Sequence, residues 1–474
     1  MSCDMKTLAL VALIALIVAV FSSATASPSV QALGNASSLA AAGAQKPAKT
    51  LGTPAATGSQ SQPSTTSPAA PAATEKEVTA YTLPPDLYAK ARRFSRAQYQ
   101  LYLVDAVWGF IVLLLVLSWK LAPKFRDWAE RTSRARFLQA AIYAPLLLLT
   151  LGVLGLPIAV YDHWLSRAYG ISVQGWGSWT WDWTKGQLLS FLLGIILVWI
   201  LYGVIRRSAQ RWWFYFWLCT IPILVFVFFI SPWVIDPLFY KFEALQPKQP
   251  ELVATLENVV QRAGMNIPPD RMYLMKASEK LNALNAYVTG FGASKRVVVW
   301  DTTLRKMNRA ETAFVFGHEM GHYVLGHIPK GIAFFAVVFL ILFYLGYRFI
   351  GGMLARWGAR WAIRGVDDLA SLPVLMLLLS LLSFLATPIL SAFSRYQEHQ
   401  ADVYGLEVTH GLTPNSSQVA ARAFQILGEV DLADPDPPAF MKLWLYDHPS
   451  IPDRVQFALT YDPWSKGEQP QFVK

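Results

Sequence analysis

Long apolar runs dominate the hydrophobic pattern of this 474-residue chain. Several of them reach about 20 residues, the length that an α-helix needs to cross a bilayer. They predict membrane spans at residues 101–119, 137–160, 186–205, 212–232, 331–350 and 369–393. Tryptophans and tyrosines gather at the ends of these runs, as they do at membrane–water interfaces. The pattern therefore predicts a mainly α protein, a polytopic helix bundle of six spans in a lipid bilayer.

Two segments before the first span have a different composition. Residues 1–26 combine Lys6, an apolar stretch and a small-residue motif, which is typical of a secretory signal peptide or an anchor. Residues 27–78 are rich in Ala, Ser, Thr, Pro and Gly, so they predict a disordered linker. The first four spans then form a membrane region at residues 79–232.

Polar periodicity returns between the fourth and fifth spans. Residues 251–264 place their apolar side chains on one helix face, whereas residues 271–276 and 297–300 have the composition of strands. Residues 285–290 lie between these strands and are a candidate edge strand. We therefore expect a small β-sheet with a helix beside it.

The last two spans form a predicted membrane hairpin at residues 331–393. Both flanking segments, 233–330 and 394–474, then leave the membrane on the same side. We expect them to fold together as the two parts of one domain outside the bilayer.

Composition excludes several classes of protein. Apolar residues make up 54% of the chain and charged residues 15%, against about 25% charged in a soluble protein. A soluble enzyme is therefore excluded, and two cysteines are too few for a disulfide scaffold. The net charge of +10 fits basic cytoplasmic loops, and because no nucleic-acid-binding module accompanies it, we expect no nucleic-acid partner.

The motif H-E-x-x-H at residues 318–322 carries the clearest chemistry. On a helix, His318 and His322 lie on one face and can bind the same metal ion through imidazole nitrogens. Glu319 can reach a water molecule as a general base. Two imidazoles and a carboxylate are a common ligand set of catalytic zinc, so we predict one Zn²⁺ per chain.

A second helix is expected to supply the third ligand, and Glu398 is the candidate. Asp402 lies on the same helix face and can accept a hydrogen bond from a ligand histidine, which would fix its tautomer. The alternative is a solvated polar turn with an internal ion pair to Arg395. We prefer the metal site because the hairpin returns Glu398 to the membrane end where the helix of His322 runs into the fifth span.

The remaining histidines give weaker signals. His448, followed by Arg454, could direct a donor at a developing oxyanion, and a surface turn is the alternative. His327 is nine residues beyond His318, half a turn out of phase on a continuous helix. We therefore expect His327 at the membrane interface and not at the metal.

In their order along the chain, these segments resemble the type I CAAX prenyl protease family, which are integral-membrane zinc endopeptidases. The resemblance extends from about Ala91 to the C-terminus. It includes residues 94–97, 156–163, 232–242, 285–290, 318–322, 394–402 and 448–449. The motif at 318–322 is shared by many proteases, whereas the order of all these segments around the same spans is much more specific.

The resemblance implies zinc held by His318, His322 and Glu398. It implies that Glu319 activates water, with a cage of membrane helices around a water-filled chamber. Asp402 matches a position usually given a proton-donor role, although we prefer the hydrogen bond to a ligand histidine.

The resemblance also implies residues that contact substrate. Asn285, Ala286 and Tyr287 would lie on an edge strand that pairs with the substrate backbone. His448 and Arg454 would orient substrate or stabilise the oxyanion.

These observations favour a membrane-embedded zinc metalloendopeptidase, similar to CAAX prenyl protease, that cleaves a peptide or membrane-protein substrate. One alternative is a membrane-protein quality-control protease without prenyl specificity. Another is a non-catalytic membrane scaffold, against which the intact H-E-x-x-H motif argues.

Loop charge predicts the orientation in the membrane. The loops at residues 120–136, 206–211 and 351–368 are basic and fall on one side, whereas the loop at 161–185 is neutral. The positive-inside rule places the basic loops in the cytoplasm and the active site outside, in a bacterial inner membrane if the secretory-type start is taken into account. The family resemblance implies an active site that faces the cytosol.

Overall fold

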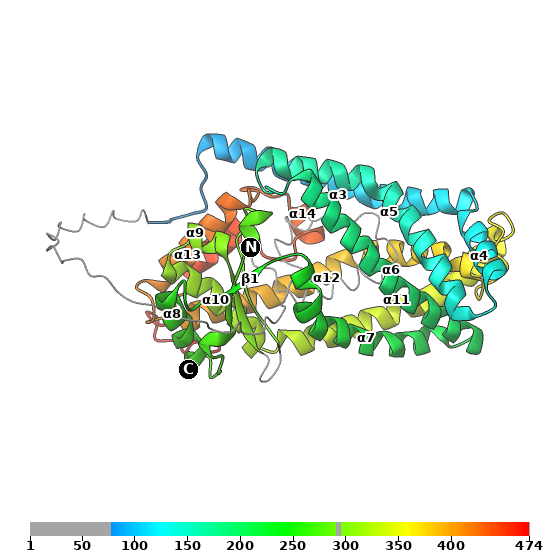
Figure 1. The fold of residues 1–474 in the computed structure, drawn as a ribbon. Coiled ribbons are helices and arrows are strands. Elements are labelled where there is room, and N and C mark those ends of the chain that lie inside the picture. Colours follow the sequence, from blue (N-terminus) through cyan, green and yellow to red (C-terminus); the bar gives the residue numbers. More distant parts are fainter. Residues whose placement is uncertain (1–76, 291–294, 474) are drawn as a thin grey trace, which may run out of the picture.

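The computed structural model describes residues 77–290 and 295–473 of the chain, except for the side chains of residues 226–232. The predicted signal or anchor at residues 1–26 lies outside this part, as does nearly all of the predicted linker. The long helices run side by side away from one end (Figure 1). At that end lie α8 (Pro250–Arg262), α9 (Asp301–Lys306), α10 (Arg309–Val324) and α13 (Ser416–Val430), and α4 (Leu121–Thr132) lies near the other end.

The helix bundle that the apolar runs predicted is confirmed. Among the described residues, five helical segments are long and apolar enough to cross a membrane. They comprise α3 (Pro85–Ser118), α5 (Arg136–Tyr169), α6 (Trp176–Arg207), α11 (His327–Trp357), and the turn η5 (Leu369–Ser371) continued by α12 (Leu372–Thr409). The fourth predicted span corresponds to α7 (Trp212–Val234). The part of α7 whose side chains are described, Trp212–Val225, is apolar but too short by itself to cross a membrane.

The first cytoplasmic loop that we predicted, at residues 120–136, is mostly a helix. It forms α4 (Leu121–Thr132), in which apolar residues recur on one face and Arg126 is buried. Arg126 binds Asp368 at the far end of the hairpin and Asp127 beside it. An amphipathic face and a buried ion pair, neither of which is apparent from charge alone, therefore order this segment.

The predicted small sheet is confirmed, with one further strand. Its order is β1 (Phe242–Ala244), β2 (Met272–Met275), β4 (Arg296–Trp300) and β3 (Ala286–Thr289). β2 and β4 are parallel and the other two pairs are antiparallel, so β3 lies at an edge as predicted. The predicted amphipathic helix is α8 (Pro250–Arg262), whose apolar face packs into the core beneath the sheet.

Shorter elements complete this end of the molecule. They are η1 (Asp236–Leu238), η2 (Pro269–Arg271), η3 (Ala277–Glu279), α9 (Asp301–Lys306), α10 (Arg309–Val324), α13 (Ser416–Val430), α14 (Ala439–Trp444) and α15 (Ile451–Thr460). One apolar core joins side chains that precede the hairpin, such as Leu256 and Phe316, to side chains that follow it, such as Leu406 and Phe424. The two segments on either side of the hairpin therefore share a single core.

The helix that carries H-E-x-x-H does not run into the fifth span, and our prediction of a continuous helix was wrong. α10 ends at Val324 and α11 begins at His327. Gly326 lies between them with φ 66° and ψ 34°, a left-handed conformation that only glycine adopts at little cost. The helix is interrupted there, so helical phase counted from His318 does not extend to His327.

α10 and α12 approach each other closely because glycines replace side chains at the contact. A Cβ added at Gly317 would lie 2.8 Å from Val408 Cγ1, and one at Gly321 would lie 2.9 Å from Tyr404 Cβ. On the opposite helix, a Cβ at Gly405 would lie 3.0 Å from the backbone nitrogen of His318. The backbone of the H-E-x-x-H helix is therefore seated directly on α12.

We expect Gly405→Ala to destabilise the protein and to lower its metal content, because the added methyl group meets rigid backbone at His318. Overpacking of this kind typically costs about 1–3 kcal/mol. Thermal unfolding and metal content of the detergent-purified protein measure both effects. Gly351→Ala is the matched control, because a Cβ there meets nothing within 4 Å. Equal behaviour of the two variants would contradict the close-contact argument.

Candidate metal centre

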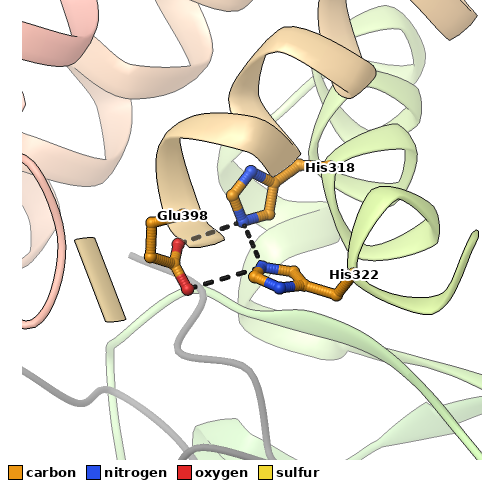
Figure 2. A group of neighbouring side chains, drawn as sticks. All are labelled: His318, His322 and Glu398. Atoms are coloured by element: carbon orange, nitrogen blue, oxygen red, sulfur yellow. Dashed lines mark hydrogen bonds and ion pairs between the residues drawn. The ribbon is translucent and has the colours of Figure 1, made fainter. Parts of the chain in front are cut away.

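Three buried side chains from two helices converge on one point (Figure 2). α10 supplies His318 and His322, and α12 supplies Glu398; each is at most 2% exposed. The two Nε2 atoms are 3.1 Å apart, and the carboxylate oxygens of Glu398 lie 3.3 Å from His318 Nε2 and 3.4 Å from His322 Nε2. The structure thus brings together the three residues that the sequence singled out as metal ligands.

The spacing of these atoms fits a metal ion. Two ligand atoms, each about 2.05 Å from a tetrahedral ion, lie about 3.3 Å apart. The two Nε2 atoms, 3.1 Å apart, are close to that value. Each imidazole also has one Glu398 oxygen at a similar distance, Oε2 at 3.3 Å from His318 and Oε1 at 3.4 Å from His322. Two imidazole nitrogens and one carboxylate are also the donor set of catalytic zinc sites that keep one position open.

Asp402 and Arg454 lie behind His318. Asp402 Oδ1 is 2.8 Å from His318 Nδ1, the ring nitrogen that points away from the other two candidate ligands. Arg454 donates two hydrogen bonds to Asp402, at 2.9 and 2.5 Å, and its Nη2 is 3.4 Å from His318 Nδ1. This bidentate pair compensates the buried carboxylate and fixes its orientation.

His327 lies behind His322, in a position that our helical-phase argument missed. Its Nδ1 is 2.9 Å from His322 Nδ1, and its Nε2 is 3.2 Å from the amide oxygen of Gln400. The side chain is 2% exposed, so it does not lie free at the membrane interface. Gly326 was the available signal, because a glycine four residues after a motif can end the helix that the phase argument assumes.

His448 is fully buried and faces Glu398. Its Nε2 is 3.0 Å from Glu398 Oε2, and its Nδ1 is 2.8 Å from Asp447 Oδ1. The surface-turn alternative for His448 is therefore wrong. The solvated-turn alternative for Glu398 is wrong as well, because Arg395 donates to backbone carbonyls of the segment at residues 442–446 and Glu398 is buried.

The carboxylates around His318 and His448 favour the protonated forms of both side chains when no metal is bound. Burial lowers the pKa of His318, but Asp402 and Glu398 outweigh that effect and raise it to about 9. Burial also opposes charge on His448, and Glu398 and Asp447 raise its pKa to about 10. A metal ion binds only neutral imidazole, so metal binding at neutral pH must displace the proton of His318. Apparent metal affinity therefore increases with pH up to about 9.

The other predicted residues lie on α10 or on the strand that contacts it. Glu319 follows His318 on α10 and is 2% exposed. Asn285, Ala286 and Tyr287 are buried at the start of the edge strand β3, which contacts α10. The backbone of Asn285 faces inward, where its N–H donates to Thr303 Oγ1 at 2.8 Å. The structure therefore places the predicted substrate strand beside the H-E-x-x-H helix.

Two protein-family models match the chain in succession. "CAAX prenyl protease N-terminal, five membrane helices" matches residues 66–241, and "Peptidase family M48" matches residues 246–462. Together they cover the membrane helices before the sheet and the whole candidate metal centre.

Curated relatives and a solved structure agree with these matches. The chain is 37% identical to an uncharacterized metalloprotease, YhfN, of Bacillus subtilis, over 82% of this chain and 89% of that protein. It is 24% identical to CAAX prenyl protease 1 of Saccharomyces cerevisiae, over 79% of this chain and 86% of that protein. The crystal structure of Ste24p from S. mikatae superposes with a TM-score of 0.69 at 22% identity, covering 82% and 92% of the two chains, which shows that the fold is shared.

Proposed function

The chain belongs to peptidase family M48 and is a multi-pass membrane metallopeptidase, and from this premise we propose that it is a zinc-dependent endopeptidase. The observation that carries the proposal is the buried triangle of donor atoms from His318, His322 and Glu398, with Glu319 adjacent on α10. Family membership excludes the third function that we considered, a non-catalytic membrane scaffold.

Zinc held by these three residues would polarise the scissile carbonyl and lower the pKa of a water molecule. Glu319 is the proposed general base: it takes a proton from the attacking water and returns it to the leaving amine. The low exposure of Glu319 keeps bulk water from competing for that proton.

Three further residues have proposed supporting roles. Asp402 accepts a hydrogen bond from His318 Nδ1–H, which leaves Nε2 free to bind the metal, and Arg454 holds Asp402 in place. This geometry supports a positioning role for Arg454, because its Nε and Nη2 atoms are both engaged by Asp402. His448 lies with Nε2 3.0 Å from Glu398 Oε2, beside the candidate metal ligands, and is proposed to orient substrate or stabilise the oxyanion.

The substrate is proposed to be a peptide or membrane protein whose backbone adds to the edge strand at Asn285, Ala286 and Tyr287. Two substrate classes remain to be distinguished, prenylated CAAX-type peptides, to which the name of the yeast relative points, and unmodified membrane-protein segments. The first is the favoured proposal on the resemblance of the whole chain, and the second is a quality-control activity. Cleavage of matched farnesylated and unmodified peptides separates them.

We expect Glu319→Gln to lower peptide cleavage by at least about 10²-fold while zinc stays bound, since the variant loses the base but no ligand. Zinc content by atomic emission and cleavage of a labelled peptide measure the two effects. Glu468→Gln, at an exposed glutamate, is the control that should leave both unchanged. Wild-type turnover in zinc-loaded Glu319→Gln would remove Glu319 from this role.

His327 is proposed to fix the tautomer of His322. The amide oxygen of Gln400 accepts the Nε2–H of His327, so His327 Nδ1 carries a lone pair. That lone pair accepts the Nδ1–H of His322, which leaves His322 Nε2 free for the metal. Each ligand histidine thus has its own partner behind it, an aspartate for His318 and a neutral imidazole for His322.

We expect His327→Phe to weaken zinc affinity by about 10–100-fold, as other changes behind a ligand do. His327→Asn should restore most of the affinity, because its side-chain oxygen can accept the same Nδ1–H. Competition with a chelator gives the affinity, and the absorption spectrum of the Co²⁺-substituted protein reports the ligand field independently of activity. Equal loss in both variants would mean that His327 only fills space.

The metal centre is proposed to lie on the outer side of the membrane, because the basic loops lie at the opposite end of the molecule and basic loops are usually cytoplasmic. We expect Ser465→Cys to react in intact cells with a membrane-impermeant maleimide, and Ala359→Cys to react only after lysis. Cys3 and Cys219 are changed to serine in both variants. The reverse pattern would establish the cytosolic orientation instead.

A further inference from the structure

The end of the bundle remote from the metal centre contains a cavity that the peptidase chemistry does not use. Its volume is about 360 Å³. α5 and α6 form its walls. The residues that line it are Arg136, Ala140, Val198, Trp199, Tyr202, Gly203, Arg206, Arg207 and Leu369.

Three arginines give the cavity its charge. In the described part of the chain, Arg136, Arg206 and Arg207 form no ion pair. Arg136 donates to the neutral amide of Gln139 at 3.0 Å, and Arg206 lies 5.6 Å from the centroid of the Tyr202 ring. The nearby carboxylate of Asp368 is already bound by Arg126 and the backbone N–H of Arg364. Asp367 and Asp368 act on Arg206 only through space, so among the described residues no carboxylate is paired with any of the three arginines.

An apolar track leads from the membrane interior to these arginines. Along one side of α6, large apolar side chains are exposed at Leu188, Leu192, Ile196 and Trp199. The next position on that side is Gly203, where a Cβ would meet nothing within 4 Å. The eleven residue steps of helix from Leu192 to Gly203 span about 16 Å, roughly half of the hydrocarbon thickness.

Aromatic rings mark the level of the headgroups at the same place. Trp199 is 46% exposed and packs edge-to-face on Phe137 of α5, with ring centroids 5.7 Å apart. Tryptophan prefers the boundary between acyl chains and headgroups. The track therefore meets the charged cavity at the depth where a phospholipid changes from acyl chain to phosphate.

We propose that this cavity binds the headgroup of an anionic phospholipid, with its phosphate on Arg136, Arg206 and Arg207 and an acyl chain along the exposed side of α6. Basic pockets between membrane helices bind such headgroups through charge and hydrogen bonds. Because Gly203 has no side chain, the glycerol backbone of the lipid has space to enter the cavity there. The lipid would bridge α5 and α6 at the end of the bundle where the hairpin also closes.

Native mass spectrometry of the delipidated full-length protein with added phosphatidylglycerol tests the proposal. An arginine near an anionic surface contributes about fivefold in binding, so Arg206→Gln/Arg207→Gln should weaken phosphatidylglycerol binding roughly 25-fold. Arg356→Gln/Arg360→Gln is the matched control, since it removes two charges at the same end of the bundle but outside the cavity. Gly203→Phe fills the cavity without changing charge and should weaken binding as well.

Two further measurements distinguish the source of the phosphate. Phosphatidylcholine should bind much more weakly than phosphatidylglycerol, and inorganic phosphate at tens of millimolar should not displace the bound lipid. Unchanged zinc content and peptide cleavage show that each variant is folded. Equal loss in the control pair, undiminished binding to Gly203→Phe, or displacement by inorganic phosphate would each overturn the lipid site.

Discussion

The close contact of α10 with α12 is the constraint on which the rest of this structure depends. Two of the three candidate ligands come from one helix and the third from the other, so the triangle of donor atoms exists only while the two backbones stay in register. Glycines on both sides of the contact remove the side chains that would otherwise separate the helices. Packing, and not the ligands themselves, therefore sets the ligand spacing that suits a metal ion.

Burying so many ionisable groups in one place requires that each be compensated. A buried charge without a partner is strongly destabilising, whereas a paired and hydrogen-bonded one is tolerated. Here His318 has Asp402 behind it, Asp402 has Arg454, and Glu398 has His448. The partners behind the ligands thus also determine which ring nitrogen of each histidine is directed toward the other candidate ligands.

The two ends of the molecule are built for different surroundings. At the end with the metal centre, the sheet and the helices around it share one core with the segment after the hairpin. At the other end, Arg126 and Asp368 tie α4 to the end of the hairpin, while other arginines remain available around a cavity. The basic residues that predict the orientation thus fall into two groups. Arg126 forms a structural ion pair, and Arg136, Arg206 and Arg207 line the cavity.

The sequence by itself determined the membrane class, the helix bundle and the candidate ligands His318 and His322, because hydrophobic period and H-E-x-x-H spacing are local properties of a chain. It offered β3 as a candidate edge strand, and the order of the sheet decided that position. It also led to Asp402 as a partner of a ligand histidine, since residues four apart share a helix face. Only the tertiary structure decided what lies behind each ligand. His327 was misjudged because Gly326 ends the helix, and α4 was taken for a loop because its amphipathic face matters only once α5 and the hairpin lie against it. Contacts between residues distant in sequence depend on where helices end and the backbone turns. Helical periodicity predicts nothing about side-chain positions beyond such an end.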